Sequence, residues 1–351
     1  FACLLGTIPR VAADEAVDAA SGTVRLLLSA EPPSLDSVRA TDQVSFFVLA
    51  HLMDGLLQYD AGNRLAPALA ERWELRPDGA TFWLRRGATW EDGAPVTAHD
   101  FVHAWREVLR PANAAPYASL LYPLQNARAI ASGELPVESL GVRAPEDHRL
   151  EVAFGQPCAW FPALTAFMTL LPLRADFHAA QGGRHAADAG RLLANGPFRL
   201  ARWVHGAELV LEKNPRYWNA GAIRLQRIEV PYMTTDAQAE LNLFLDRRIA
   251  MANIAPDSVR QVLLERQRLR RFADGYVHFL AFNFREGRAT RNLRLRRAIQ
   301  AALDPGEIVN RVLRRPGPRP AEWLFPSVLR GRERAFIGRY PLAGGARGDA
   351  I

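Results

Sequence analysis

The chain has 351 residues, of which 49% are hydrophobic and 23% are charged. These values are typical of a folded globular protein and exclude a disordered or collagen-like chain, and the length favours two or three domains. The net charge is +7, and almost all of the positive charge is arginine, because Lys213 is the only lysine. No zinc-finger spacing, RNP-like aromatic motif or lysine-rich tail accompanies the arginines, so we expect no nucleic-acid partner.

The first residues resemble the end of an export signal. Residues 1–8 are mainly apolar, and Val11-Ala12-Ala13 places small side chains at the −3 and −1 positions of a signal-peptidase site. We therefore expect residues 1–13 to be a signal-peptide remnant and the protein to be periplasmic. A frayed apolar N-terminus is the alternative, and a lipoprotein anchor at Cys3 is less favoured because apolar residues follow this cysteine rather than precede it.

Strand and helix signals alternate irregularly along the rest of the chain. Runs that are rich in β-formers or alternate in polarity predict strands at residues 23–28, 73–76, 81–85, 140–154 (two short strands), 196–204, 207–211, 227–230 and 277–284. Apolar residues at helical spacing predict helices at residues 44–57, 97–109 and 292–303, and a further helix that starts at Asp304. This order predicts a mixed α/β class with more than one sheet.

Two local patterns carry the strongest structural signals. Pro77-Asp78-Gly79 separates two alternating runs, which predicts a β-hairpin. Thr97 and Asp100 have the spacing of a capping box, in which the threonine caps the free amides and the third helical residue bonds back to the cap. The helix that they begin is expected to run to about Leu109, before Pro111.

Catalytic motifs are lacking in the sequence. It contains no Gly-rich phosphate loop, no dinucleotide-binding fingerprint and no nucleophile elbow, so we expect neither an enzyme nor a cofactor. His99 and His103 are four residues apart on a predicted helix, but the glutamate of a metalloprotease motif and a third ligand are missing. We interpret them as a helix-surface pair rather than a metal site. Cys158 lies in an apolar segment, which predicts a buried structural thiol.

The hairpin and the capped helix belong to a longer recognisable pattern. Leu65–Glu74, Asp78–Arg85 and Trp90–Phe101 closely resemble the signature region of the extracellular solute-binding family 5, which includes oligopeptide-, dipeptide- and nickel-binding receptors. Further similar segments follow the family's order, at Ser34-Leu35-Asp36, Ala115–Ala118, Leu140–Ala144, Asn195–Phe198, Lys213–Trp218 and Asn292–Asp304. Each match alone is weak, but the ordered set is specific, and the oligopeptide branch fits best.

The resemblance implies a periplasmic binding protein-like fold of class II, with two lobes, an extra domain and mixed sheets. It places lobe I at residues 22–57 and 190–275, the extra domain of lobe I at 58–189, and the first part of lobe II at 276–351. Family members continue well beyond Ile351, so we expect a fragment or a truncated product. The missing part would complete lobe II and supply an aspartate that pairs with the amino terminus of a peptide.

The resemblance also implies a monomeric, non-catalytic receptor that captures oligopeptides between its lobes and delivers them to the permease subunits of an ABC importer. Thr41, Asp42 and Gln43 align with the family's early loop that touches the peptide, although the family often has a glutamate at the position of Thr41. Tyr117 matches a tyrosine that faces the ligand, and ordinary packing beside Pro116 is its alternative role. A nickel chelate, haem, an oligosaccharide or an opine as ligand, a sensory or regulatory domain, and a non-binding fragment are the alternative functions.

Overall fold

The computed structural model describes residues 16–270, 276–313, 318–321, 324–325 and 329. The predicted signal remnant at residues 1–13 and most of the chain beyond residue 321 lie outside the described residues. The described residues form two compact units, which divide between Ala252 and Asn253. Among the described helices, none combines the length and apolar character needed to cross a bilayer.

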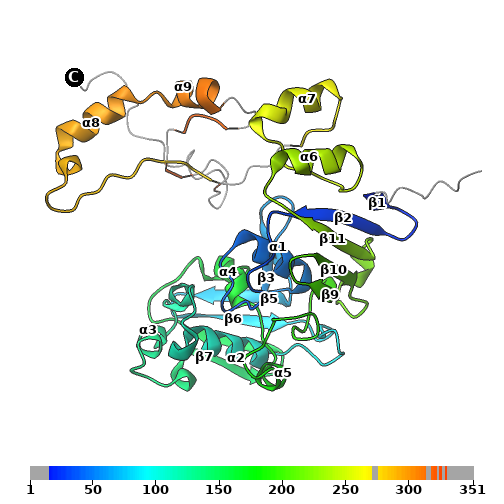
Figure 1. Cartoon of the computed structure of the whole chain (residues 1–351). Coiled ribbons are helices and arrows are strands. Elements are labelled where there is room, and N and C mark those ends of the chain that lie inside the picture. The colour runs from blue at the N-terminus through cyan, green and yellow to red at the C-terminus, as the bar shows by residue number, and fades with distance from the viewer. Residues whose placement is uncertain (1–15, 271–275, 314–317, 322–323, 326–328, 330–351) are drawn as a thin grey trace, which may run out of the picture. The chain divides into compact units, whose positions relative to one another are not determined.

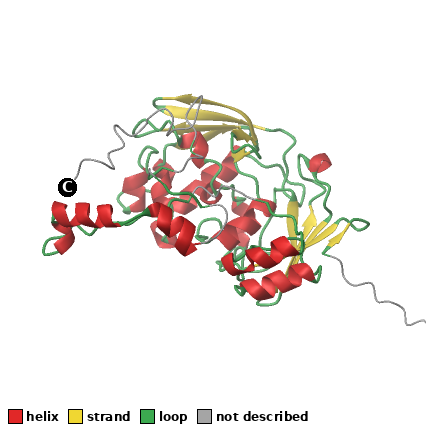
Figure 2. Cartoon of the chain, turned by 90° about the horizontal axis from the view of Figure 1, so that it is seen from above, coloured by secondary structure: helices red, strands yellow, loops and turns green. Residues whose placement is uncertain are grey.

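The first unit contains two larger sheets, which Figure 2 shows as separate groups of strands. The five-stranded sheet has the order β1-β2-β11-β10-β9 and consists of β1 (Val17–Asp18), β2 (Thr23–Leu28), β9 (Phe198–Val204), β10 (Glu208–Lys213) and β11 (Arg227–Met233). Strands β2 and β11 are parallel and the other neighbouring pairs are antiparallel. The sheet therefore joins an early chain segment to a much later one (Figure 1).

The second sheet has four antiparallel strands in the order β5-β6-β8-β7. It consists of β5 (Ala70–Arg76), β6 (Gly79–Leu84), β7 (Val142–Glu146) and β8 (Arg149–Ala153), and a two-stranded sheet of β3 (Leu57–Tyr59) and β4 (Leu65–Pro67) precedes it. Helix α2 (Ala98–Leu109) packs against β7 and β8 (Figure 1). Its apolar face is buried there, and Trp105 donates its indole hydrogen to the Leu170 carbonyl oxygen at 3.1 Å.

The remaining helices are distributed over both units. The first unit also contains α1 (Gln43–Leu52), α3 (Ala127–Ala131), α4 (Phe161–Leu164), α5 (Ala175–Ala180) and α6 (Ala237–Leu245). The second contains α7 (Val259–Leu264), α8 (Leu293–Ala302), α9 (Pro305–Glu307) and the π-helix η8 (Ile308–Leu313). Asn292 and Asp304 cap α8 and α9 by accepting backbone amides, so the predicted helices at 292–303 and from Asp304 are confirmed.

The predicted capping box is present at the start of α2. The backbone amide of Thr97 donates to the Asp100 Oδ2 atom at 2.8 Å, and the indole of Trp90 donates to the same oxygen at 3.3 Å. Asp100 is buried, and this burial raises the pKa of its carboxyl group. The motif therefore both starts the helix and ties it to the core.

The predicted hairpin of β5 and β6 is also confirmed, and Gly79 is the residue that its geometry requires. A Cβ atom at Gly79 would lie 2.3 Å from the Val152 carbonyl oxygen on β8. Since backbone on both sides would have to shift, Gly79→Ala is expected to lower the free energy of unfolding by about 2 kcal/mol. Urea denaturation measures this change.

Gly87→Ala is the matched control for the Gly79 substitution. A Cβ atom at Gly87 has no heavy-atom neighbour within 4 Å, so this variant is expected to unfold like the parent protein. Equal destabilisation by the two substitutions would show that loss of glycine itself, and not the contact with Val152, causes the effect.

Two predicted elements differ from the structure. The predicted strand at 277–284 is wrong, because residues 276–284 form no strand and no other described segment pairs with them. The predicted helix at 44–57 ends too late, since α1 stops at Leu52 and Leu57 belongs to β3. The Leu52 carbonyl accepts the Gly196 amide at 2.8 Å, which draws the chain out of the helix.

Asp54 follows α1 and forms the centre of a buried polar junction. Its Oδ2 atom accepts hydrogen bonds from the Tyr217 hydroxyl at 3.0 Å and the Trp218 indole at 2.9 Å. Its backbone amide donates to the Asn195 Oδ1 atom at 2.8 Å. The guanidinium of Arg85 lies 4.1 Å from the centre of the Trp218 ring. Residues from four distant chain segments thus meet around Asp54.

Candidate functional site

The predicted ligand segment Thr41-Asp42-Gln43 lies at the start of α1. Asp42 is the N-cap of this helix: its Oδ1 atom accepts the Ser45 amide at 2.8 Å, and its Oδ2 atom accepts the Ser45 hydroxyl at 2.6 Å. Its carboxylate therefore holds the turn, while the side chains of Thr41 and Gln43 are exposed. A ligand contact by these three residues stays a prediction.

Tyr117 lies directly beside this segment although it is far away in sequence. Its hydroxyl donates to the Thr41 carbonyl oxygen at 3.4 Å. Its ring packs edge-on against Phe167, with centroids 5.3 Å apart, and lies 6.3 Å from the ring of Phe46 on α1. The structure thus brings Tyr117 and Thr41 together, and it gives Tyr117 a packing role as well.

Tyr117 also forms part of an apolar pocket of about 370 Å³. The lining residues, which we call the aromatic pocket, are Tyr59, Tyr117, Leu120, Trp160, Ala163, Leu164, Ala166 and Phe167. Trp160 and Tyr59 are 55% and 51% exposed, which is unusual for such large apolar side chains. Apart from Tyr117, the sequence did not indicate these residues, because they come from β3, from the short helix at Ala118–Leu121 and from residues 160–167, without a common period.

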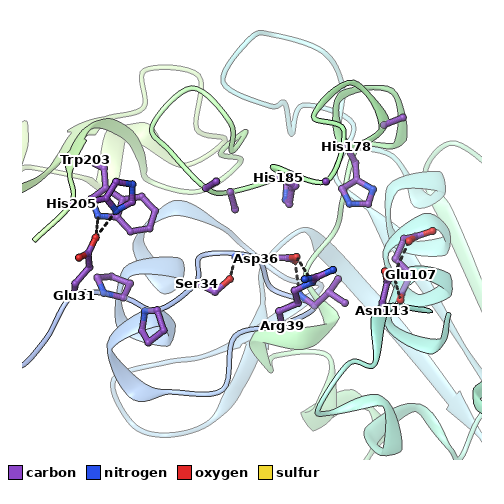
Figure 3. A pocket seen from close by; sticks show the side chains of 17 residues that line it. Glu31, Ser34, Asp36, Arg39, Glu107, Asn113, His178, His185, Trp203 and His205 are labelled. Atoms are coloured by element: carbon purple, nitrogen blue, oxygen red, sulfur yellow. Dashed lines mark hydrogen bonds and ion pairs between the residues drawn. The ribbon is translucent and has the colours of Figure 1, made fainter. Parts of the chain in front are cut away.

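A second pocket, of about 750 Å³, lies elsewhere on the same unit (Figure 3). At one end Glu31 accepts hydrogen bonds from the Trp203 indole at 3.0 Å and from the backbone amide of Gly206 at 2.8 Å, and its Oε1 atom lies 2.5 Å from His205 Nδ1. At the other end Glu107 accepts the Asn113 amide at 2.9 Å. The polar groups at these two ends are therefore bonded within the protein. The polar and aromatic side chains that line this pocket, which we call the histidine pocket, are Glu31, Ser34, Asp36, Arg39, Glu107, Asn113, His178, His185, Trp203 and His205.

His178 and His185 line one wall of the histidine pocket, and His103 on α2 lies against His178 behind it. His103 Nε2 lies 3.2 Å from His178 Nδ1, and the rings of His178 and His185 are 5.0 Å apart. Both ring nitrogens of His185 are shielded from water and have no hydrogen-bond partner, and burial lowers the pKa of His185 to about 4. Burial also lowers the pKa of His103.

The interpretation of His99 and His103 as a surface pair needs correction. His99 is exposed and lies 3.5 Å from the Asp147 carboxylate, whereas His103 is half-buried against His178. The two differ because His178 on α5 contacts His103, whereas the partner of His99 is the exposed Asp147. Within the part of the chain that the structure describes, no three His, Cys, Asp or Glu side chains are arranged to hold a metal ion.

The predicted buried thiol is confirmed. Cys158 is 1% exposed, and burial raises its pKa. It lies just before Trp160 and α4, so it packs the loop that carries part of the aromatic pocket rather than supplying a nucleophile.

Comparison with known proteins places the chain in a family. The family model for bacterial extracellular solute-binding proteins, family 5 Middle, matches residues 64–342. The oligopeptide-binding protein OppA of Bacillus subtilis (strain 168) is 30% identical over 318 residues, which are 89% of this chain and 58% of that protein. The probable deoxycholate-binding periplasmic protein YgiS of Escherichia coli (strain K12) is 32% identical over 86% of this chain and 56% of its own length.

A solved structure, Listeria monocytogenes OppA bound to peptide, superposes with a TM-score of 0.72 at 30% identity and covers 87% of this chain and 61% of its own. The chain thus spans under two thirds of the length of each of these relatives. The likeness confirms the predicted mixed α/β fold of the class II periplasmic binding proteins. This chain belongs to the bacterial extracellular solute-binding proteins of family 5.

Proposed function

We propose that the complete protein is a periplasmic receptor that captures oligopeptides between two lobes and delivers them to the permease subunits of an ABC importer. One observation carries the proposal: the Tyr117 hydroxyl holds the Thr41 carbonyl, so that two elements aligned with the family's ligand contacts share one surface. The family is a family of solute-binding receptors, and the similarity to OppA proteins of two species supports a peptide as the ligand.

The proposal includes the lobe assignment and the absence of catalysis. Residues 22–57 and 190–275 form lobe I, residues 58–189 form its extra domain, and residues 276–351 begin lobe II. Binding closes the lobes by a hinge motion whose populations the ligand shifts. The receptor acts as a monomer and needs no cofactor, because main-chain hydrogen bonds and side-chain pockets suffice to hold a peptide.

A second candidate ligand is a bile acid, and two observations favour it. One relative carries the name of a probable deoxycholate-binding protein, and the aromatic pocket is lined by apolar and aromatic side chains. A rigid amphipathic steroid and an apolar peptide side chain place similar demands on such a surface.

Native mass spectrometry of the full-length gene product, purified without denaturation, tests the proposal. We expect heterogeneous additional mass in the range of short peptides, which leaves the protein on denaturation. The control is the same protein after unfolding, washing and refolding, which is expected to lose this mass and to regain it from a peptide mixture. A single additional mass that matches deoxycholate, or turnover of any added solute, would contradict the peptide-receptor proposal.

A further inference from the structure

We propose that the aromatic pocket receives one bulky apolar side chain of the bound peptide, so that the protein selects peptides with an aromatic or large aliphatic residue at that position. This inference rests on the proposed function, because it names the ligand chemistry of the same site. Three features of the pocket support it: the composition of its wall, the packing of that wall and its place beside Thr41.

The wall carries no charged side chain among its eight lining residues. Its polar side-chain atoms are the hydroxyls of Tyr59 and Tyr117 and the indole nitrogen of Trp160, and the Tyr117 hydroxyl already donates to Thr41. A charged side chain that entered this wall would lose hydration without gaining an ion-pair partner. An apolar side chain would lose only unfavourable contact with water.

The wall is also built before any ligand arrives. Phe167 packs edge-on against both Tyr117 and Phe46, with ring centroids 5.3 Å apart in each pair. Behind it, the Thr165 hydroxyl is buried and donates to the Pro162 carbonyl oxygen at 2.8 Å. A preformed pocket gains affinity because few side chains must be ordered on binding.

The place of the pocket connects it to the ligand segment. Tyr117 is at once a lining residue of the pocket and the hydrogen-bond donor to the Thr41 carbonyl. A peptide main chain that contacts residues 41–43 therefore lies beside the pocket, and a side chain is the part of it that can enter. The volume of about 370 Å³ is at the lower end of the range of small-molecule sites, which suits one large side chain better than a whole folded ligand.

The histidine pocket is larger, but several of its polar groups already have hydrogen-bond partners within the protein. Glu31 is already bonded to Trp203 and Gly206, and Glu107 is bonded to Asn113. A polar ligand would have to displace these bonds before it formed its own. The aromatic pocket exposes large apolar surfaces of Trp160 and Tyr59 that no described residue covers, so burying them is the larger gain.

The experiment measures binding of the full-length protein to synthetic tripeptides by isothermal titration calorimetry. The probes are trialanine and variants of it in which phenylalanine, leucine, aspartate or lysine replaces each alanine in turn. We expect phenylalanine and leucine at one position to bind about 10- to 100-fold more tightly than aspartate or lysine there. At the other two positions we expect differences of less than about threefold.

Two variants assign this preference to the pocket. Trp160→Ala is expected to weaken binding of the phenylalanine peptide about tenfold more than binding of trialanine, and Ala163→Glu is expected to shift the preference towards lysine. Leu75→Ala, an exposed apolar residue on β5 outside the pocket, is the matched control and leaves the preference unchanged. Thermal unfolding verifies that all three variants are folded.

The outcomes distinguish failure of the side-chain preference from failure of the peptide function. Peptide binding without an apolar preference, or a uniform loss of affinity for all peptides in Trp160→Ala, overturns the inference and leaves the peptide receptor standing. No binding of any peptide together with binding of deoxycholate overturns the peptide function itself.

Discussion

Replacing Asp54 with alanine is expected to lower the free energy of unfolding by about 3–5 kcal/mol. The side chain accepts two hydrogen bonds at one oxygen, from Tyr217 at 3.0 Å and from Trp218 at 2.9 Å. Tyr217 is only 8% exposed, so water cannot replace the lost acceptor there. Each buried donor left without a partner costs about 1–3 kcal/mol, and the small cavity adds to this.

Asp54→Asn is the control that separates the hydrogen bonds from the charge. Burial raises the pKa of Asp54, while the bonds from Trp218 and Tyr217 partly oppose this shift. The asparagine oxygen keeps two lone pairs for the same two donors and carries no charge that burial would penalise. This variant is therefore expected to stay within about 1 kcal/mol of the parent protein.

Urea denaturation followed by tryptophan fluorescence measures both variants, and Tyr217→Phe completes a double-mutant cycle with Asp54→Ala. The loss in the double variant is expected to be smaller than the sum of the two single losses, because both substitutions remove the same bond. Strict additivity, or a loss in Asp54→Asn as large as that in Asp54→Ala, would show that the Tyr217 bond does not stabilise the junction.

The same junction explains part of the family pattern seen in the sequence. Asn195 bonds to the backbone of Asp54, and the neighbouring Gly196 approaches the end of α1 so closely that a Cβ atom would lie 2.7 Å from the Leu52 carbonyl carbon. Residues that were recognised only as similar to family segments thus have a common physical role. They fasten the segment after α1 to the strands of the five-stranded sheet.

The hairpin and the start of α2 were predicted correctly because each depends on residues that are close together in the sequence. The turn at Pro77-Asp78-Gly79 and the capping box at Thr97 and Asp100 are both formed within a few residues, so their sequence patterns were sufficient. The end of α1 depends instead on a bond between Leu52 and Gly196, which no local window contains. The run at 277–284 has a strand pattern, but a strand also needs a partner to share its ladder.

The candidate site was predictable only in part, for a similar reason. The resemblance indicated Thr41 and Tyr117, and the structure places them in contact. Trp160 in a loop and Tyr59 at the end of β3 carried no signal, because the sequence does not show that the fold brings these two exposed aromatic residues together. His103 and His185 likewise each contact His178 only because α5 and the loop after it pack against α2.

Lowering the pH from about 6.5 to 4 is expected to destabilise the protein through His185. The pKa of this histidine is about 4 in the folded protein and near its ordinary value of 6.5 in the unfolded chain. Between these values the unfolded chain binds more protons, so acidification favours unfolding, and the contribution reaches about 3 kcal/mol at pH 4. The cause is structural: both ring nitrogens are buried without a hydrogen-bond partner, and the neighbouring His178 and His103 further lower the pKa of His185 when they carry charge.

His185→Phe removes this titration while keeping an aromatic ring against His178 and Phe177. We expect the variant to match the parent protein at pH 7.5 within about 1 kcal/mol, and to be more stable by about 3 kcal/mol at pH 4. Urea denaturation at the two pH values measures the difference, and His99→Gln, at an exposed histidine on α2, is the control that should follow the parent protein.

Only the difference between variant and parent protein isolates His185. Burial raises the pKa values of the carboxyl groups of Asp36, Asp54, Glu91 and Asp100, so acidification stabilises the folded state through these groups, opposite in sign to the histidine. These carboxyl groups titrate in both proteins, so their contributions to the free energy of unfolding cancel when the two proteins are compared. A difference between His185→Phe and the parent protein that stays constant from pH 7.5 to 4 would mean that His185 is solvated in solution and that the histidine pocket is open to water.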